Sequence, residues 1–140
     1  MPDPVFLDTN PIIRYLTQDN PDQAARARSL FERAAQGELA LYLSESVVVE
    51  IVQVLSSRVT YNLPRSEVER HLLNVFSLRG FRIPQRNTYR RALELWVATP
   101  QVRDFVDCLS VAHMERGRIA TIASFDEDFD RFQQIKRQEP

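Results

Sequence analysis

Short apolar runs alternate with longer stretches of helical periodicity along this chain. Strands are predicted where an apolar run is brief and bounded by turn residues. Four such runs are Val5–Asp8, Leu39–Leu43, Phe81–Ile83 and Ile119–Ala123, with Gln134–Lys136 as a candidate last edge strand. We expect the first of them, Val5–Asp8, to be buried.

Between these runs, apolar residues recur at helical spacing and cap or stop signals mark the ends. The predicted helices cover Pro11–Leu16, Asp22–Ala35, a stretch capped by Ser44 or Ser46 through Leu55, Ser66 to about Leu78, Asn87–Thr99 and Asp104–Gly117, with a short helical turn opened by Asp126. Strands that alternate with helices imply βαβ crossovers and a parallel sheet covered on both faces. The predicted fold class is therefore α/β.

Length and composition indicate one globular domain over residues 1–140. A chain of 140 residues that is 44% hydrophobic is long enough to bury a core without disulfides or a structural metal. The apolar stretch Leu39–Leu55 is interrupted by Glu45 and Glu50, so we expect no membrane span and a soluble, cytoplasmic protein. The single cysteine, Cys108, excludes an internal disulfide.

Charge does not identify a partner. The net charge of −1 argues against binding nucleic acid by bulk electrostatics, yet the basic residues are almost all arginine, which suits phosphate contacts. The helices Asp22–Ala35 and Val68–Phe76 offer apolar faces for a homodimer or for a partner helix, and these faces fit core packing equally well.

Asp8 ends the first predicted strand. In α/β proteins the carboxyl ends of parallel strands open onto the crevice that binds ligands, so this carboxylate is placed for chemistry. The alternative is that Asp8 or Asn10 simply caps the helix that follows.

Glu50 interrupts an apolar helix, between Val47-Val48-Val49 and Ile51-Val52. A buried charge is costly unless it has a partner, so Glu50 is a candidate cation ligand. Alternatively it faces solvent on the polar side of the helix with Gln53 and Ser57.

Three further acids lie at the starts of helices. Asp104 and Asp107 share a helix face three residues apart, and Asp126 follows the strand that ends at Ala123. Capping and the helix dipole are sufficient explanations for each of them. Asp128 and Asp130 are assigned to the solvated face of their turn.

The joint placement of these acids is harder to explain by capping. A parallel sheet brings the strand ends at Asp8 and Asp126 together, with Glu50 and the Asp104–Asp107 turn on flanking helices. Converging carboxylates repel one another and resist ionisation without a cation. An all-oxygen cluster suits Mg²⁺ or Mn²⁺, which activates water and neutralises charge on a phosphodiester.

These segments resemble the PIN-domain ribonucleases, most closely the VapC-type toxins of bacterial and archaeal toxin–antitoxin pairs. The resemblance covers nearly the whole chain. It is carried by Phe6-Leu7-Asp8-Thr9-Asn10, by Glu50 in Val47-Val48-Val49-Glu50-Ile51-Val52, by Asp104-Phe105-Val106-Asp107-Cys108-Leu109 and by Ser124-Phe125-Asp126-Glu127-Asp128-Phe129.

The resemblance implies a three-layer α/β/α sandwich with a central parallel sheet, and Mg²⁺- or Mn²⁺-dependent endonucleolytic cleavage of RNA. Asp8, Glu50, Asp107 and Asp126 match the family's acidic quartet, and Asn10 matches a polar residue that supports the first acid. Asp104 lies one turn before Asp107 and is either a further ligand or a cap. A cognate antitoxin is implied as a partner.

Two other functions fit parts of the pattern. An aspartate-based phosphatase of the haloacid dehalogenase type needs a second aspartate where this chain has Asn10. It also needs a lysine to steady the phosphorylated aspartate, and this chain has none in a suitable place. A binding module that holds RNA or protein without catalysis is the other alternative, and a nuclease assay discriminates it.

Overall fold

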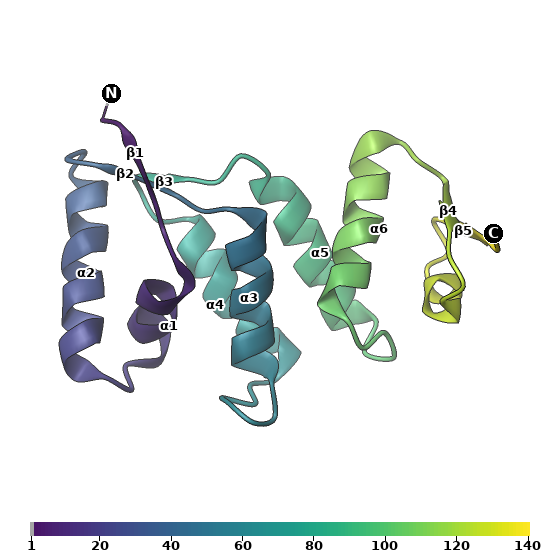
Figure 1. Ribbon diagram of the computed structural model, residues 1–140, viewed down its shortest axis with the longest axis horizontal. Helices are drawn as coiled ribbons and strands as arrows, with labels where there is room; N and C mark the ends of the chain where they lie inside the picture. Colours follow the sequence, from purple (N-terminus) through teal and green to yellow (C-terminus); the bar gives the residue numbers. More distant parts are fainter. Residues whose placement is uncertain (1) are drawn as a thin grey trace. The chain divides into compact units, whose positions relative to one another are not determined.

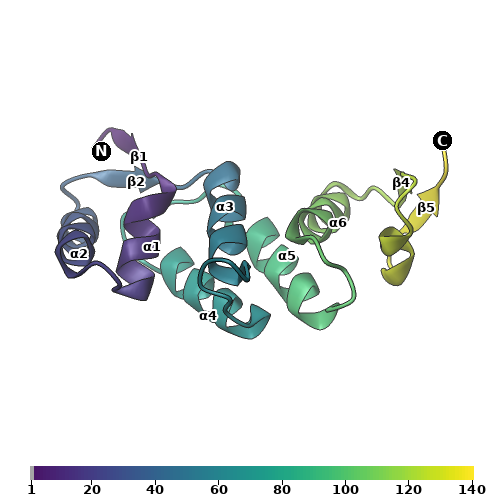
Figure 2. The same ribbon diagram turned by 60° about the horizontal axis from the view of Figure 1, so that its bottom comes forward.

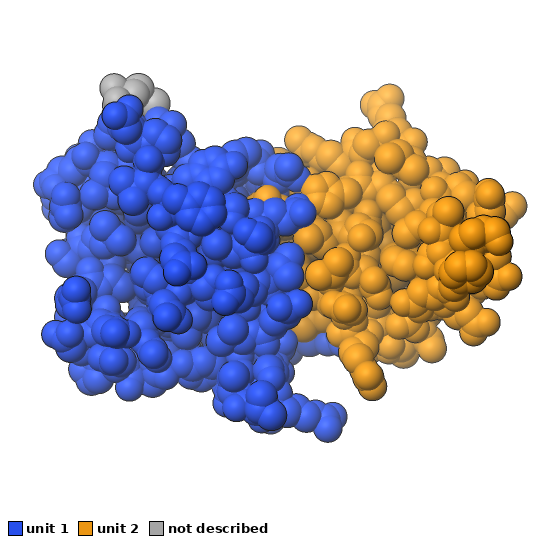
Figure 3. All heavy atoms as spheres, in the orientation of Figure 1, with its two compact units in different colours: residues 1–86 blue, residues 87–140 orange. Residues whose placement is uncertain are grey.

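The computed structural model describes residues 2–140, which divide into two compact units, shown in blue and orange in Figure 3. The first unit extends to Arg86 and the second comprises Asn87–Pro140. Each unit contains its own parallel sheet.

The first unit holds three strands and four helices (Figure 1). In chain order they are β1 (Pro4–Phe6), α1 (Thr9–Thr17), α2 (Pro21–Ala35), β2 (Ala40–Tyr42), α3 (Glu45–Ser56), α4 (Arg65–Phe76) and β3 (Phe81–Arg82). The strands pair in parallel in the order β1-β2-β3, with Val5 opposite Leu41 and Leu41 opposite Phe81. Each parallel pair needs a crossover connection, and two helices supply it each time. The predicted α/β class is confirmed.

The expectation that the first strand is buried is wrong for β1. Val5 is 48% exposed and Phe6 is 61% exposed, whereas Leu7, just after the strand, is 2% exposed. The physical reason is position, because β1 is an edge strand of its three-stranded sheet.

The helices of the first unit pack on one another. α1 contacts both α2 and α3, and the two ribbon views place it between them (Figures 1 and 2). The α1–α2 contact includes an edge-to-face ring pair between Tyr15 and Phe31, with centroids 4.9 Å apart. The largest fully buried side chains of this unit come mostly from its helices, namely Ile12, Leu41, Leu43, Val48, Ile51, Val52, Leu55, Val68, Leu72, Val75 and Phe76.

The second unit begins within α5 (Arg86–Ala98) and continues through α6 (Phe105–Gly117), β4 (Thr121–Ala123), the 3₁₀ turn η1 (Glu127–Arg131) and β5 (Lys136–Gln138). α5 and α6 are joined by an edge-to-face contact between Trp96 and Phe105, with centroids 5.7 Å apart. An ion pair between Arg91 and Glu115, at 2.9 Å, connects the same two helices.

β4 and β5 pair in parallel and η1 lies between them in the chain. Phe129 and Phe132 are buried and anchor this turn. Arg137 on β5 donates two hydrogen bonds to the Asp130 carboxylate, at 3.0 and 3.1 Å, and one to the Ser124 carbonyl at 3.2 Å. This fork fixes the segment between β4 and β5, which carries Asp126 and Asp128.

Several predicted boundaries differ from the observed ones; α1, for example, begins at Thr9 rather than Pro11, and β4 begins at Thr121 rather than Ile119. The helix predicted from Ser66 begins one residue earlier, at Arg65, with Pro64 in the cap position. The last strand is Lys136–Gln138 and not Gln134–Lys136. Among residues 2–140, no helix is long and apolar enough to cross a membrane.

Candidate metal centre

The first turn of α6 carries two acids with different environments. Asp104 occupies the N-cap position, and its Oδ1 accepts a hydrogen bond from the Val106 N–H at 3.3 Å. Asp107 lies in the first helical turn, where the helix dipole favours a negative charge. Asp104 therefore serves as the cap of α6, whereas the Asp107 carboxylate faces the acidic side chains described next.

Asp126 caps η1 just after β4. Its Oδ1 accepts a hydrogen bond from the Asp128 N–H at 2.9 Å, and its own N–H donates to Ser124 Oγ at 3.0 Å. These two bonds fix the turn, so the Asp126 and Asp128 side chains are held on the same segment.

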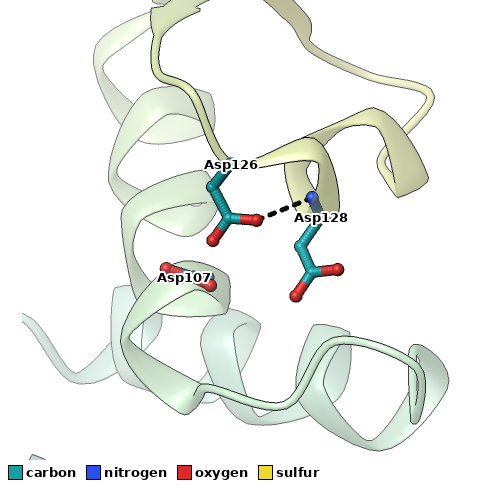
Figure 4. A group of neighbouring side chains, drawn as sticks. All are labelled: Asp107, Asp126 and Asp128. Atoms are coloured by element: carbon teal, nitrogen blue, oxygen red, sulfur yellow. Dashed lines mark hydrogen bonds between the residues drawn. The ribbon is translucent and has the colours of Figure 1, made fainter.

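Asp107, Asp126 and Asp128 form a group of three carboxylates, which we call the aspartate triad (Figure 4). Each offers one oxygen, and these three oxygens lie within 4.8 Å of one another. Asp107 comes from α6, while the other two come from the cap and body of η1. Figure 4 shows the three carboxylates facing a common space.

The Asp107 carboxyl is the electrostatically strained member of the aspartate triad. Its pKa is raised to about 6, first by burial and then by the negative charges of Asp104, Asp126 and Asp128. Both causes disfavour the ionised form. A cation among these oxygens reverses the balance, because it favours every carboxylate in its charged state.

The donor set fits a hard divalent cation. All three ligand atoms are carboxylate oxygens, and such ligands favour Mg²⁺, Mn²⁺ or Ca²⁺ over metals that select sulfur or imidazole. One protein cation reaches the group, since Arg131 Nε lies 3.6 Å from Asp128 Oδ1, but burial and the neighbouring carboxylates still raise the pKa of Asp107. The aspartate triad can therefore hold a metal of the Mg²⁺ class.

Two other acids singled out from the sequence, Asp8 and Glu50, belong to the first unit. Asp8 occupies the N-cap position of α1, but its side chain makes no capping hydrogen bond. Glu50 is exposed on α3, and its Oε2 accepts a hydrogen bond of 2.8 Å from Thr9 Oγ1. Because Thr9 directly follows Asp8 and is buried, it fixes Glu50 beside the strand end that carries Asp8. Asn10 is exposed in the first turn of α1.

Sequence reasoning missed Asp128 and Thr9. The sequence places Asp128 on the solvated face of its turn; its side chain is 34% exposed, and the 3₁₀ turn also brings its carboxylate into the aspartate triad. The available signal was its spacing, two residues after an N-cap aspartate. Thr9 carried no signal beyond its position next to Asp8.

Comparison with protein families places these features in one context. The PIN domain family matches residues 5–135, which is nearly the whole chain and includes every acid described above. The chain belongs to the PIN domain family. No match was found among curated proteins.

PIN domains are generally metal-dependent nucleases, so an acidic group able to hold a metal is expected in this one. The family match extends through both units of the PIN domain, from β1 to the loop before β5. Family membership also agrees with the α/β architecture and the parallel pairing of its strands.

Proposed function

We propose that this PIN domain is an endoribonuclease that uses Mg²⁺ or Mn²⁺ to cleave RNA phosphodiester bonds. The observation that carries the proposal is the aspartate triad, in which the pKa of Asp107 is raised to about 6 inside a PIN domain. Perturbed carboxylates of this kind are typical of sites that work with a cation.

Five acids share the work in this proposal. Asp107 and Asp126 hold the metal, with Asp128 as an additional oxygen ligand from the same turn. Asp8 and Glu50 complete the acidic set, as the resemblance of their segments to the family implies, and Asn10 supports Asp8. Asp104 caps α6 and raises the pKa of Asp107 rather than acting as a ligand.

The metal, when bound, activates water and neutralises the charge that develops on the phosphodiester. Other residues of the chain hold the proposed acidic side chains in position. Thr9 keeps Glu50 in place through the 2.8 Å hydrogen bond, and the Asp128 N–H keeps the Asp126 carboxylate in place at 2.9 Å. Fixed carboxylates keep their geometry during the reaction and need no reorganisation.

The biological role that we propose is that of a VapC-type toxin. Its partners are then an RNA substrate and a cognate antitoxin in the cytoplasm, and the toxin acts as a homodimer. The support for this finer assignment is the resemblance of the four acidic segments to such toxins.

A cleavage assay with purified protein tests the proposed reaction. Wild type with Mn²⁺ should cleave single-stranded RNA, and EDTA should abolish the activity. Asp107→Asn should reduce the rate by at least about 100-fold, since it removes a ligand while preserving size. Asp8→Asn should also abolish cleavage and retain the fold.

The matched control is Asp3→Asn, which removes an exposed carboxylate outside the proposed set and should leave the rate unchanged. Full activity of Asp107→Asn or Asp8→Asn would overturn the assignment of that residue. Binding of RNA by wild type without any metal-dependent cleavage would instead favour the non-catalytic binding module.

A further inference from the structure

A cleft lies between α1 and α2 in the first unit, apart from the aspartate triad. Its volume is about 460 Å³, within the range of pockets that hold small organic ligands. Its polar lining consists of Asn10, Arg14, Gln23, Arg26, Ser29 and Arg33. Pro11, Ala27 and Leu30 supply apolar contacts. We call this feature the α1–α2 cleft.

The α1–α2 cleft is lined by several arginines. Among the described residues that line it, three are arginines and none is acidic. Arginine is suited to phosphate because its planar fork offers several N–H donors. Each of these arginines is paired with an acid outside the lining, so the cleft presents its positive charge to a ligand where such a pair can open.

Arg14 is held in a fixed position. Its Nη1 donates to both Asp19 oxygens, at 3.0 and 3.1 Å, and its Nε donates to Gln23 Oε1 at 2.9 Å. Asp19 also accepts hydrogen bonds from Thr17 and Tyr61, and these bonds lower its pKa to about 2. Asp19 therefore stays ionised and keeps Arg14 in place at the cleft.

Arg26 and Arg33 are more available. The Arg26–Asp22 pair is long, at 3.7 Å, with side chains 77% and 80% exposed. Arg33 pairs with Glu38 at 3.0 Å, and both side chains are more than half exposed. Exposed pairs of this kind contribute little, so an incoming anion can replace the carboxylates at small cost.

We propose that the α1–α2 cleft binds the phosphodiester backbone of the RNA strand that the PIN domain cleaves. The proposal rests on the proposed function and adds the path of the substrate. Asn10, which lines the cleft, is two residues from Asp8 on the same helix start. A strand seated on these arginines therefore continues toward a proposed metal ligand.

The lining also predicts how this binding depends on sequence. None of the described lining residues is aromatic, so the cleft offers no stacking platform for bases. Arginines that contact phosphates position a strand without reading its bases. Binding in the cleft should therefore be sensitive to salt and tolerant of sequence.

Fluorescence anisotropy with a labelled oligonucleotide of about 12 uridines, in EDTA to prevent cleavage, tests the cleft directly. Each phosphate contact on a single strand contributes a salt slope of about 0.7, which is about five-fold in affinity at about 0.1 M salt. Arg26→Gln combined with Arg33→Gln should weaken binding by about 25-fold and reduce the slope by about 1.4. A second oligonucleotide of different sequence should lose affinity to the same extent.

The control is Arg28→Gln, which removes the same charge from the same helix outside the cleft. It should change affinity by less than about two-fold, because Arg28 makes none of the proposed phosphate contacts. Unchanged affinity and slope in the double variant would overturn the proposal. A labelled acidic peptide serves as a second probe. If the double variant lost binding to this peptide but still bound RNA like wild type, the proposal would also be overturned.

The outcomes separate this proposal from the proposed function. Arginine-dependent RNA binding without metal-dependent cleavage would leave the cleft assignment intact and overturn the nuclease. Cleavage that depends on Asp107 but is unaffected by the arginine substitutions would support the nuclease and overturn the assignment of the cleft.

Discussion

At the scale of single residues, burial and neighbouring charge act in the same direction on Asp107. The pKa of this carboxyl is raised to about 6, first by burial and then by Asp104, Asp126 and Asp128. Ionisation is therefore more costly in the folded chain than in the unfolded chain, whose ordinary value is 3.8. The metal-free protein should lose stability as pH rises through this interval.

The first prediction concerns the pH dependence of Asp107→Asn. Below about pH 4 the carboxyl is protonated in both states and the substitution should be nearly neutral. Above about pH 6, metal-free wild type carries the full penalty, so the variant should melt about 3–6 °C higher, equivalent to about 1 kcal/mol. Thermal melts in EDTA at pH 4 and pH 7.5 measure the difference.

Excess Mn²⁺ provides the control for this comparison, since a bound cation favours the ionised carboxylate only in wild type. The melting temperature of wild type should then equal or exceed that of the variant at pH 7.5. A gap between the two proteins that is the same at both pH values would contradict the assigned electrostatic strain.

At the scale of elements, the end of α2 packs against the turn before β3. Gly80 has φ +85°, and a Cβ there would lie 2.3 Å from the Ala34 carbonyl oxygen. The Gly80 carbonyl accepts a hydrogen bond from the Leu41 N–H at 2.8 Å, so the turn is also tied to β2. Only glycine permits this close approach.

The second prediction compares two glycines with nearly the same backbone conformation. Gly80→Ala should destabilise the protein by about 3 kcal/mol or more, from left-handed strain plus overpacking against the α2 backbone. Gly37 has φ +86° with nothing within 4 Å of an added Cβ, so Gly37→Ala should cost only about 1–2 kcal/mol. Urea unfolding of both variants measures this difference, and equal losses would show that the contact with Ala34 is unimportant.

At the scale of the whole molecule, the proposed acidic set is drawn from both units. Asp8 and Glu50 belong to the first, and the aspartate triad belongs to the second. Residues that share one ion are energetically coupled, whereas independent residues have additive effects. Coupling therefore tests whether the carboxylates act on the same metal.

The third prediction is a double-mutant cycle between Asp8→Asn and Asp107→Asn. Mn²⁺ should raise the melting temperature of wild type, and each single variant should lose most of that rise. The double variant should lose little more of the metal-induced rise in melting temperature than either single variant.

The cycle of Asp3→Asn with Asp107→Asn is the control, and its effects should add. Additive effects in the Asp8–Asp107 cycle would contradict a shared ion. Equal melting temperatures of wild type with and without Mn²⁺ would count against any metal in this set.

The amino-acid sequence determined the features that depend on local order. Apolar periodicity located the helices, as α2 shows: the predicted range is Asp22–Ala35 and the observed one is Pro21–Ala35. Alternation of strands with helices gave parallel pairing, because parallel strands require crossovers. The motifs around Asp107 and Asp126 also single out two of the three residues of the aspartate triad.

Only the tertiary structure decided which side chains meet. The fork from Arg137 to Asp130 and the buried Phe129 fix η1 so that Asp128 joins Asp107, and both contacts join segments that the sequence pattern treats separately. The same holds for Thr9 and Glu50, which are 41 positions apart. Burial of β1 was mispredicted for the same reason, since an apolar run specifies a strand but not its place in a sheet. Local pattern is a property of neighbours in the chain, whereas a site depends on neighbours in space.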